Sequence, residues 1–473
     1  MTSRTKNLLK NTVILGFGQF LPKLLAIITL PILTAALTTS EYGIYDLILS
    51  AESFLLPLMT LQIQQAVFRK LIRSKQKEIN RYISSAYHFL FWAFLFWVPI
   101  IVFVLCNVFN YSINVSVIIV MFYVGFALFD VFGQTIRGLG KNIHYSVGIV
   151  VYSVTNMLVL VCLYIFFKIN VAMVFVSSIV AHFIACAFYV YSGDIISRCK
   201  LREISKKTRK ELLSYSLPII PSSISLWIVN LSDRLLITSI LGTSMNGIYS
   251  VANKVPNLFA SVYAVFNLAW TETAARAMDK DSDAGEYYSK MFDFLLRLLS
   301  GAMLILISVS PIIFQVLVNE QFDESYSQMP ILFLGVFVSS IVSFYGGIYV
   351  AKQQTKQVGI SALIGAILNI IINVSMIKRY GLYAASVSTV ISFAIIAMYR
   401  AFDLEKIVHI RYNIRLIALC ITSILVFCIF CGQRNMTANI VLFILGIIWN
   451  LIVNNRIIRL LYKMIKRTQS DAT

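Results

Sequence analysis

Charged residues are scarce in this chain of 473 residues. Asp, Glu, Lys and Arg together make up 13% of it, whereas a soluble globular chain typically carries about 25%. Hydrophobic residues make up 59%, and the mean hydropathy is +0.80. Because a soluble fold of this size could not bury so much apolar surface, the composition indicates a protein that crosses a membrane many times. It excludes a disordered chain, a disulfide scaffold and an ordinary cytosolic enzyme.

Sequence signatures of nucleotide, cofactor and metal binding are missing. The four His residues form no HExxH pattern, and no phosphate-binding GxxxxGKS, GxxxxGKT or GxGxxG motif occurs. Cys428 and Cys431 form a CxxC, but no second Cys pair and no nearby His completes a metal site. We therefore predict that the protein is not an enzyme, has no metal ion or cofactor, and is not driven directly by ATP.

Long apolar stretches recur along the whole chain. Since a helix needs about 20 mainly apolar residues to cross the roughly 30 Å hydrocarbon core, the sequence predicts an all-α fold with about fourteen transmembrane helices. These are expected near 11–36, 44–66, 82–107, 115–136, 143–167, 171–193, 212–241, 247–275, 292–317, 330–351, 357–377, 381–400, 416–431 and 437–455. The first run is too long for a signal-peptide core and lacks an A-x-A cleavage pattern, so we expect an uncleaved span.

Basic residues outnumber acidic ones by 40 to 21, which gives a formal net charge of +19. If the N-terminus is cytoplasmic, 32 of the 40 Lys and Arg fall in cytoplasmic segments, four in the opposite loops and four within spans. This asymmetry follows the positive-inside rule and predicts that both termini are cytoplasmic. Contacts with anionic lipid headgroups account for the charge, so we expect membrane lipids and no nucleic acid as partners.

One short motif occurs twice in the chain. LTTSEYGIY at 37–45 and LGTSMNGIY at 241–249 share T-S-x-x-G-I-Y at an offset of 204 residues. The repeat predicts two six-helix units, which are parallel because six is an even number of spans. The expected organisation is an N-terminal lobe at 1–193, a basic cytoplasmic linker at 194–211, a C-terminal lobe at 212–402, and two additional helices with a cytoplasmic tail at 403–473.

Several predicted spans carry polar residues along one helical face. One face of the second span carries residues at steps of three and four: Asp46, Ser50, Ser53, Pro57, Thr60 and Gln64. We expect such stripes to face a hydrophilic cavity between the halves, around which the halves rock; the alternative is interhelical hydrogen bonding in a dry bundle. The amides predicted to bind substrate are Gln19, Gln64, Asn253 and Asn257.

Charged residues within spans indicate a functional site. Inserting a charged side chain at the bilayer centre costs about 2.5–3.5 kcal/mol on insertion scales, so such residues usually line water or have a partner. We predict a cationic cavity that binds an anionic group, lined by Lys23, Arg234, Lys254 and Arg297. The acidic candidates for coupling to an ion gradient are Glu52, Asp130, Asp233 and Asp46. Some of these residues also have a structural alternative. Arg297 would extend its side chain to the membrane interface, and Asp46 would cap its helix. Asp233 beside Arg234 would form a structural pair with another helix.

The stretches 215–259, 265–274 and 367–392 resemble the Wzx-type oligosaccharide flippases. These are polysaccharide biosynthesis transporters of the multidrug/oligosaccharidyl-lipid/polysaccharide (MOP) superfamily. The residues that carry the resemblance are Pro218, Pro221, Ser232-Asp233-Arg234, Gly247-Ile248-Tyr249, Asn369 and Tyr380–Gly381. The resemblance implies two six-helix lobes plus two C-terminal helices in the bacterial cytoplasmic membrane. The related lipid II flippases imply a cationic vestibule, although only Arg234 of the four cations matches a family motif.

The favoured hypothesis is a flippase that translocates undecaprenyl-diphosphate-linked oligosaccharide repeat units for O-antigen, capsule or exopolysaccharide synthesis. Its further partners would be a polysaccharide polymerase and chain-length machinery. The alternatives are a cation-coupled multidrug exporter or a lipid II flippase of the same superfamily. A membrane glycosyltransferase would need a catalytic acid pair or a large outer loop, and a non-transporting scaffold would leave the buried charges without a purpose.

Overall fold

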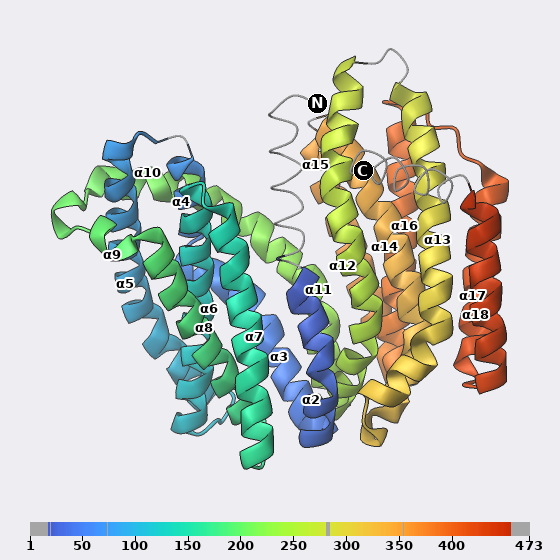
Figure 1. The fold of residues 1–473 in the computed structure, drawn as a ribbon, viewed down its shortest axis with the longest axis horizontal. Coiled ribbons are helices and arrows are strands. Elements are labelled where there is room, and N and C mark those ends of the chain that lie inside the picture. Colours follow the sequence, from blue (N-terminus) through green and yellow to red (C-terminus); the bar gives the residue numbers. More distant parts are fainter. Residues whose placement is uncertain (1–17, 19, 73, 281–283, 353, 456–473) are drawn as a thin grey trace, which may run out of the picture. The chain divides into compact units, whose positions relative to one another are not determined.

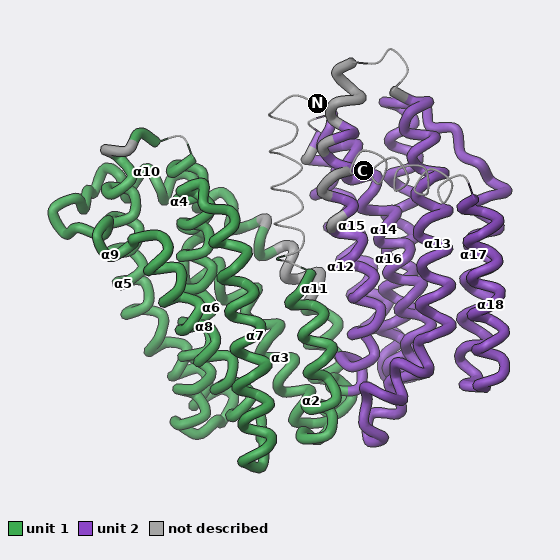
Figure 2. The backbone as a smooth tube through the Cα atoms, in the orientation of Figure 1, with its two compact units in different colours: residues 1–247 green, residues 248–473 purple. Residues whose placement is uncertain are grey.

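The computed structural model describes residues 18, 20–72, 74–280, 284–352 and 354–455, and within these ranges the chain is helical with no strand (Figure 1). The chain divides into two compact units, residues 1–247 and 248–473 (Figure 2). The all-α fold expected from the composition is confirmed.

Unit 1 begins with an apolar helix over Phe20–Ala36, whose second part is α2 (Leu30–Ala36). Its other elements are α3 (Thr39–Thr60), α4 (Ile63–Leu71), α5 (Gln76–Asn107), α6 (Ile113–Gly138), α7 (Asn142–Phe166), α8 (Val171–Gly193), α9 (Ile195–Arg198), η1 (Leu201–Glu203), α10 (Lys206–Ser216), η2 (Leu217–Ile219), α11 (Ile220–Leu241) and the first residues of α12 (Thr243–Lys280).

Unit 2 holds the rest of α12 and the two predicted C-terminal helices. Its other elements are α13 (Ala284–Leu317), η3 (Glu320–Gln328), α14 (Met329–Ala351), α15 (Thr355–Tyr380), α16 (Leu382–Glu405), α17 (Ile414–Gly432) and α18 (Met436–Val453). The last two pack on α13 and α14. α17 buries one face, which includes Cys420, Ile424 and Cys431, and leaves Leu419 and Ile429 exposed on another, as a helix at the lipid boundary would.

Within the described residues each predicted span corresponds mainly to one helix, and two of them are interrupted: 44–66 between α3 and α4, and 212–241 by η2. Eleven described helices are long and apolar enough to cross a membrane, and Phe20–Ala36 is a shorter apolar helix. The predicted spans at 212–241 and 247–275 correspond to α11 and α12. A membrane protein with about this number of spans is therefore confirmed, and the number fourteen stays a prediction.

The second predicted span, 44–66, corresponds to α3 but contains a break that the sequence does not predict. α3 ends at Thr60 and α4 begins at Ile63. Between them, Leu61 and Gln62 adopt left-handed backbone conformations with φ of 47° and 56°. Such a conformation costs roughly 1–2 kcal/mol for a residue with a side chain, so the break needs support from the surrounding fold.

The two copies of the T-S-x-x-G-I-Y motif contact each other within unit 1. The Thr39 hydroxyl lies 2.7 Å from that of Ser244, and the Ser40 hydroxyl lies 2.6 Å from that of Thr243. The two pairs are equivalent under the offset of 204 residues, so the contact is reciprocal. It joins the start of α3 to the start of α12.

A salt bridge also ties α11 to α3. Nε of Arg234 donates to Oδ2 of Asp46 at 2.6 Å, and the Asp46 side chain is only 5% exposed. This contact and the motif contact explain why α11 belongs to unit 1, although the repeat predicts a lobe boundary before it. The predicted lobes at 1–193 and 212–402 stay a prediction, since the compact units divide the chain at 247/248 instead.

Candidate functional site

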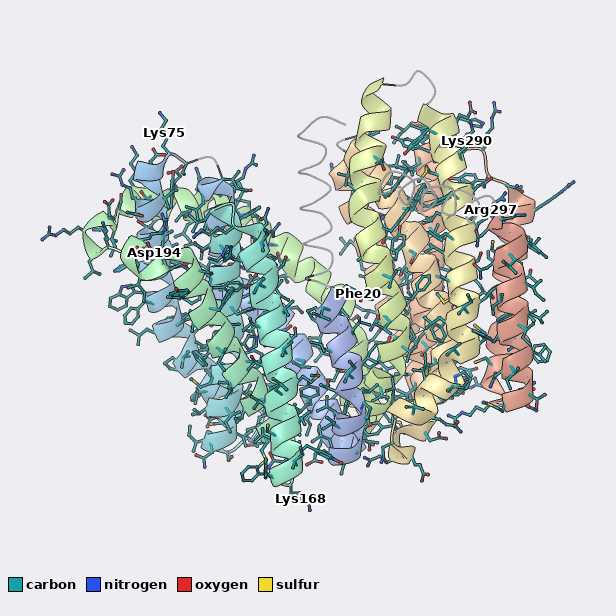
Figure 3. All side chains as sticks on the ribbon, in the orientation of Figure 1. Phe20, Lys75, Lys168, Asp194, Lys290 and Arg297 are labelled. Atoms are coloured by element: carbon teal, nitrogen blue, oxygen red, sulfur yellow. The ribbon has the colours of Figure 1, made fainter. Side chains whose placement is uncertain are left out.

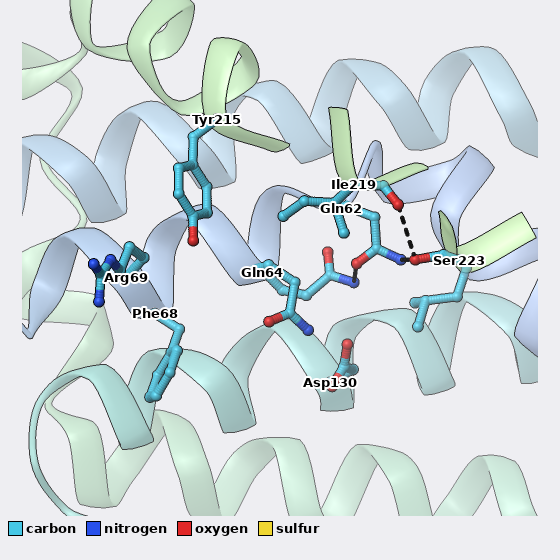
Figure 4. Close-up of a pocket in the computed structure, with 10 residues that line it drawn as sticks. Gln62, Gln64, Phe68, Arg69, Asp130, Tyr215, Ile219 and Ser223 are labelled. Atoms are coloured by element: carbon cyan, nitrogen blue, oxygen red, sulfur yellow. Dashed lines mark hydrogen bonds between the residues drawn. The ribbon is translucent and has the colours of Figure 1, made fainter. Parts of the chain in front are cut away.

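A polar cavity of about 540 Å³ lies in unit 1 beside the break between α3 and α4 (Figure 4). It is lined from α3, α4, α6, α10, η2 and α11 and from the break itself. The lining residues are Leu56, Gln62, Gln64, Gln65, Phe68, Arg69, Asp130, Tyr215, Ile219 and Ser223. Discontinuous helices that line a cavity are a recurring way to build binding sites within a membrane, because the cavity satisfies the freed backbone groups.

Three polar side chains form a connected row along one wall. Nε2 of Gln64 donates to Oε1 of Gln62 at 3.2 Å, and Nε2 of Gln62 donates to Oγ of Ser223 at 3.2 Å. Oγ of Ser223 in turn donates to the carbonyl oxygen of Ile219 at 3.3 Å. The row links the broken second span to α11 and thereby supports the left-handed backbone of Gln62.

Gln64 presents an unused hydrogen-bond acceptor. Its side chain is fully buried, and its Oε1 has no hydrogen-bond partner in the described part of the chain. A buried polar atom without a partner costs about 1–3 kcal/mol. A hydroxyl or ammonium group of a bound molecule would satisfy it.

Asp130 belongs to a second polar row, on α6. Its Oδ1 accepts from Nε2 of Gln134 at 3.4 Å, and Oε1 of Gln134 accepts from Nη1 of Arg137 at 3.1 Å. The guanidinium of Arg137 lies 4.6 Å from the ring centroid of Phe68, which also lines the cavity. The structure thus connects the three residues that helical spacing places on one face.

The basic and the acidic residue of the cavity, Arg69 and Asp130, lie at opposite ends of it. Figure 4 shows Arg69 and Tyr215 at one end and Asp130 and Ser223 at the other. Arg69 is exposed, so its guanidinium can meet an anion entering from solvent or from a lipid headgroup region. The cavity therefore offers a cation at its rim and neutral amides deeper inside.

Glu52 lies near two other ionisable side chains in unit 1. Lys23 and Asp130 both lie within electrostatic range of its carboxyl group. The three residues come from the Phe20–Ala36 helix, α3 and α6. Since Asp130 also lines the cavity, this group connects the cavity to the half-buried Glu52 and to the exposed Lys23.

The four predicted cations have different surroundings. Lys23 lies near Glu52, and Arg234 is paired with Asp46. Lys254 is half-buried on α12 in unit 2. Arg297 lies on α13 near Asp293, and Asn454 at the end of α18 donates to its carbonyl oxygen (Figure 3). A single cavity lined by all four stays a prediction.

The other predicted residues are placed as follows. Gln64 and Asp130 line the cavity in unit 1. Asn253 and Asn257 lie on α12 in unit 2, with Nδ2 of Asn253 donating to the carbonyl oxygen of Tyr249 at 2.8 Å. Asp233 is half-buried on α11. Gln19 lies outside the described residues.

The sequence predicted only two of the ten residues that line the cavity, Gln64 and Asp130. Gln62, Gln65 and Arg69 were not among the predicted site residues, nor were Tyr215 and Ser223. The glutamine-rich stretch QIQQ at 62–65, at the end of a polar stripe, was the available signal. Arg69 was counted only as a topology signal. Among the described residues no group of three or more His, Cys, Asp or Glu side chains could hold a metal ion.

Comparison with known proteins identifies the family. Residues 8–271 match the profile of the family described as "Polysaccharide biosynthesis protein", and this match covers more than half of the chain. The chain belongs to the polysaccharide biosynthesis protein family. The sequence resemblance to these transporters of the MOP superfamily is thereby confirmed.

One curated protein that is similar to this chain is named as a probable flippase. The "Probable low-salt glycan biosynthesis flippase Agl15" of Haloferax volcanii is 24% identical over 281 residues, which are 57% of this chain and 58% of that protein. The chain thus matches little more than half of the length of that relative.

Solved structures show the fold of the polysaccharide biosynthesis protein. It is similar to the lipid II flippase MurJ in an inward closed conformation, with a TM-score of 0.71, 14% identity, and coverage of 95% of this chain and 100% of MurJ. It is also similar to an inward-facing MATE multidrug transporter of the MOP superfamily, with a TM-score of 0.65, 12% identity, and coverage of 87% and 96%. The fold is therefore that of MOP superfamily transporters.

Proposed function

We propose that this polysaccharide biosynthesis protein is a flippase for undecaprenyl-diphosphate-linked oligosaccharides, and that the cavity beside the α3–α4 break receives the polar headgroup. The observation that carries the proposal is the buried Gln64 amide, with an unused acceptor, in a polar cavity at a helix break. The name of the Haloferax volcanii relative and the family description agree with it.

The physical problem for such a protein is to move sugars and a diphosphate through hydrocarbon. Burying polar and charged groups without partners is strongly unfavourable, so the protein must supply hydrogen bonds and counter-charges along the way. Arg69 is suited to a phosphate, since a guanidinium binds its oxygens in a bidentate manner. Gln62, Gln64 and Ser223 are suited to sugar hydroxyls, which both donate and accept.

The orientation follows from the positive-inside rule. The first half of α10 belongs to the basic stretch 194–211, which is predicted to be cytoplasmic, and Tyr215 near the end of α10 lines the cavity. We propose that the cavity opens toward the cytoplasmic leaflet of the bacterial inner membrane, where lipid-linked oligosaccharides would enter it. A polysaccharide polymerase and chain-length machinery would then use the product on the outer side.

The charges around Glu52 suit a coupling role in the proposed transport cycle. Protonation of Glu52 or Asp130, or binding of a cation between them, would change the net charge next to the cavity and would release or hold Lys23. An ion gradient could act on the transporter through this group. The two acids also keep the cation-coupled multidrug exporter as the second candidate function.

The test is transport of labelled lipid-linked oligosaccharide in proteoliposomes by variants at equal membrane abundance. Arg69→Ala and Gln64→Leu should each lower the transport rate, roughly tenfold or more for the arginine because hydrogen bonds to charged groups are the stronger ones. Lys75→Ala is the matched control, since Lys75 is an exposed cation that does not line the cavity (Figure 3). Wild-type rates in both variants would refute the role of the cavity. Export of cationic drugs without any glycan transport would favour the multidrug exporter.

A further inference from the structure

A second polar cavity lies in unit 2, away from the predicted site residues. It has a volume of about 570 Å³ and is formed where the end of α13, η3 and the turn between α17 and α18 meet. Its polar side chains include Gln315, Glu320 and Asn439. The sequence predicted the last two helices only as an addition to the two lobes, so nothing assigned this cavity a role.

Asn439 is one of the lining residues, and both polar atoms of its side-chain amide are unsatisfied. Its side chain is only 2% exposed, and neither Nδ2 nor Oδ1 has a hydrogen-bond partner in the described structure. Each unsatisfied buried polar atom is unfavourable, so the site requires a partner that can both accept and donate a hydrogen bond. A sugar hydroxyl does both.

The walls of the cavity are held in place by Arg434. This residue has a left-handed backbone, with φ of 53°, in the turn between α17 and α18. Its Nη1 donates to both carboxylate oxygens of Asp323, at 2.5 and 2.7 Å, and its Nη2 donates to the Asp323 carbonyl oxygen at 2.8 Å. Its guanidinium also lies 4.2 Å from the ring centroid of Tyr326. These contacts fix the turn against η3, so the cavity is formed before a ligand binds.

The charges of this cavity argue against a phosphate ligand. Asp323 neutralises Arg434, and Glu320 adds a further negative charge to the lining. An anion would therefore be repelled, whereas uncharged hydroxyl groups find amides and carboxylates that can bind them. Ile312 and Met436 are exposed apolar residues of the same lining, which suits a ligand that lies close to lipid.

We propose that this cavity binds the sugars of the lipid-linked oligosaccharide on the outer face of the membrane, after translocation. The inference rests on the proposed flippase function and on the predicted orientation, which places the loops before α14 and α18 outside. It gives the C-terminal helix pair a role: α18 supplies Asn439, and the α17–α18 turn supplies the rim. The outer site would hold the oligosaccharide while its lipid re-enters the outer leaflet.

Photo-crosslinking in proteoliposomes tests the proposal. A photoreactive amino acid replaces Met436, at the rim of the cavity, and the probe is the host's lipid-linked oligosaccharide labelled in its sugars. The control carries the same group in place of Val441, which is equally exposed on another face of α18 and does not line the cavity. We expect labelled sugar to be captured at Met436 and not at Val441.

Two further measurements test whether the capture at Met436 depends on the sugars and on Asn439. Asn439→Leu should lower the capture at Met436 roughly fivefold to tenfold, because hydrogen bonds to the buried amide are lost. An excess of the free oligosaccharide, released from its lipid, should compete with the capture at Met436; no competition would contradict the binding of the sugars in this cavity.

The flippase function and the outer sugar site in unit 2 can be refuted separately. A crosslinker in place of Leu56, an apolar residue that lines the cavity of unit 1, reports capture there. Capture there together with normal transport, but with equal yields at Met436 and Val441, would overturn the outer sugar site alone. Absence of sugar capture and of transport would overturn the flippase function itself. If Asn439→Leu does not reach the membrane, the comparison of Met436 with Val441 still decides the question.

Discussion

The hydroxyl of Thr39 lies 2.7 Å from the hydroxyl of Ser244, in the second copy of the same motif. The reciprocal pair, Ser40 and Thr243, lies at 2.6 Å, and Nδ2 of Asn246 donates to the carbonyl oxygen of Gly43 at 2.9 Å. The starts of α3 and α12 thus meet through equivalent positions, like the two halves of an isologous interface. In the predicted orientation this contact lies at the outer ends of its helices, so it would have to loosen for release to the outside.

Gly43→Ala tests the close packing of the motif. A Cβ on Gly43 would lie 1.8 Å from the carbonyl oxygen of Thr243, and one on Gly247 would lie 2.0 Å from that of Thr39. Since backbone atoms must move apart, we expect a loss of about 1–3 kcal/mol, measured as a lower thermal unfolding temperature in detergent. Gly359→Ala is the control, because no atom lies within 4 Å of its Cβ position. Equal unfolding temperatures for the two variants would contradict the packing.

A double-mutant cycle tests the ion pair between Asp46 and Arg234. Because the Asp46 side chain is 5% exposed, Asp46→Asn should leave the guanidinium poorly compensated, at a cost of up to about 3 kcal/mol. The double variant Asp46→Asn/Arg234→Gln should lose less than the sum of the single variants. Additive losses in unfolding free energy would show that the pair is not coupled. If Arg234 instead served substrate binding, Arg234→Gln would abolish transport while the stability stayed unchanged.

The linker helix α10 should be anchored in a pH-dependent way. Nζ of Lys70, in α4, donates to Oε1 of Glu211, and this hydrogen bond lowers the pKa of Glu211 below its usual value. A group with a lowered pKa in the folded state stabilises that state above its unfolded pKa, about 4.3 for Glu, and loses the effect as the pH falls below it. Protease cleavage in 194–211 should therefore become faster as the pH falls through this range.

Glu211→Gln is the control for the anchoring of α10. It removes the titrating group, so cleavage should start at the faster rate and vary less with pH than in the wild type. The same pH profile in both proteins would assign the effect to another group. The contribution of the Lys70–Glu211 contact to the anchoring of α10 is small, since the Glu211 side chain is 43% exposed and solvent screens the contact.

Position 61, in the break between α3 and α4, should accept Gly without loss of transport, whereas Pro should disrupt the site. Leu61 has φ of 47°, which Gly adopts without strain, so Leu61→Gly should retain transport and relieve roughly 1 kcal/mol of backbone strain. Leu61→Pro forces φ to about −65° and should destroy the cavity beside Gln62. The readouts are the unfolding temperature and the transport rate at equal abundance. Normal transport by Leu61→Pro would show that the break is dispensable.

Helical spacing accounts for the parts of the site that lie along one helix. Asp130, Gln134 and Arg137 share a face because helical spacing alone places them there, and the structure joins them through hydrogen bonds. The break at Leu61–Gln62 was not predicted, because neither residue is Gly or Pro and the hydropathy of the span continues through it. Gln62 of the break donates to Ser223, a residue of a helix far along the chain.

The sequence by itself determined that the protein is a helical membrane protein with short loops, because hydrocarbon requires about 20 apolar residues per span and satisfied backbone groups in each. It also determined which positions are equivalent, through the repeated motif. Only the tertiary structure decided the partners: that Asp46 meets Arg234, that Thr39 meets Ser244, and that Gln62 meets Ser223. These pairs are 161 to 205 residues apart, and no local periodicity specifies which polar stripe packs against which.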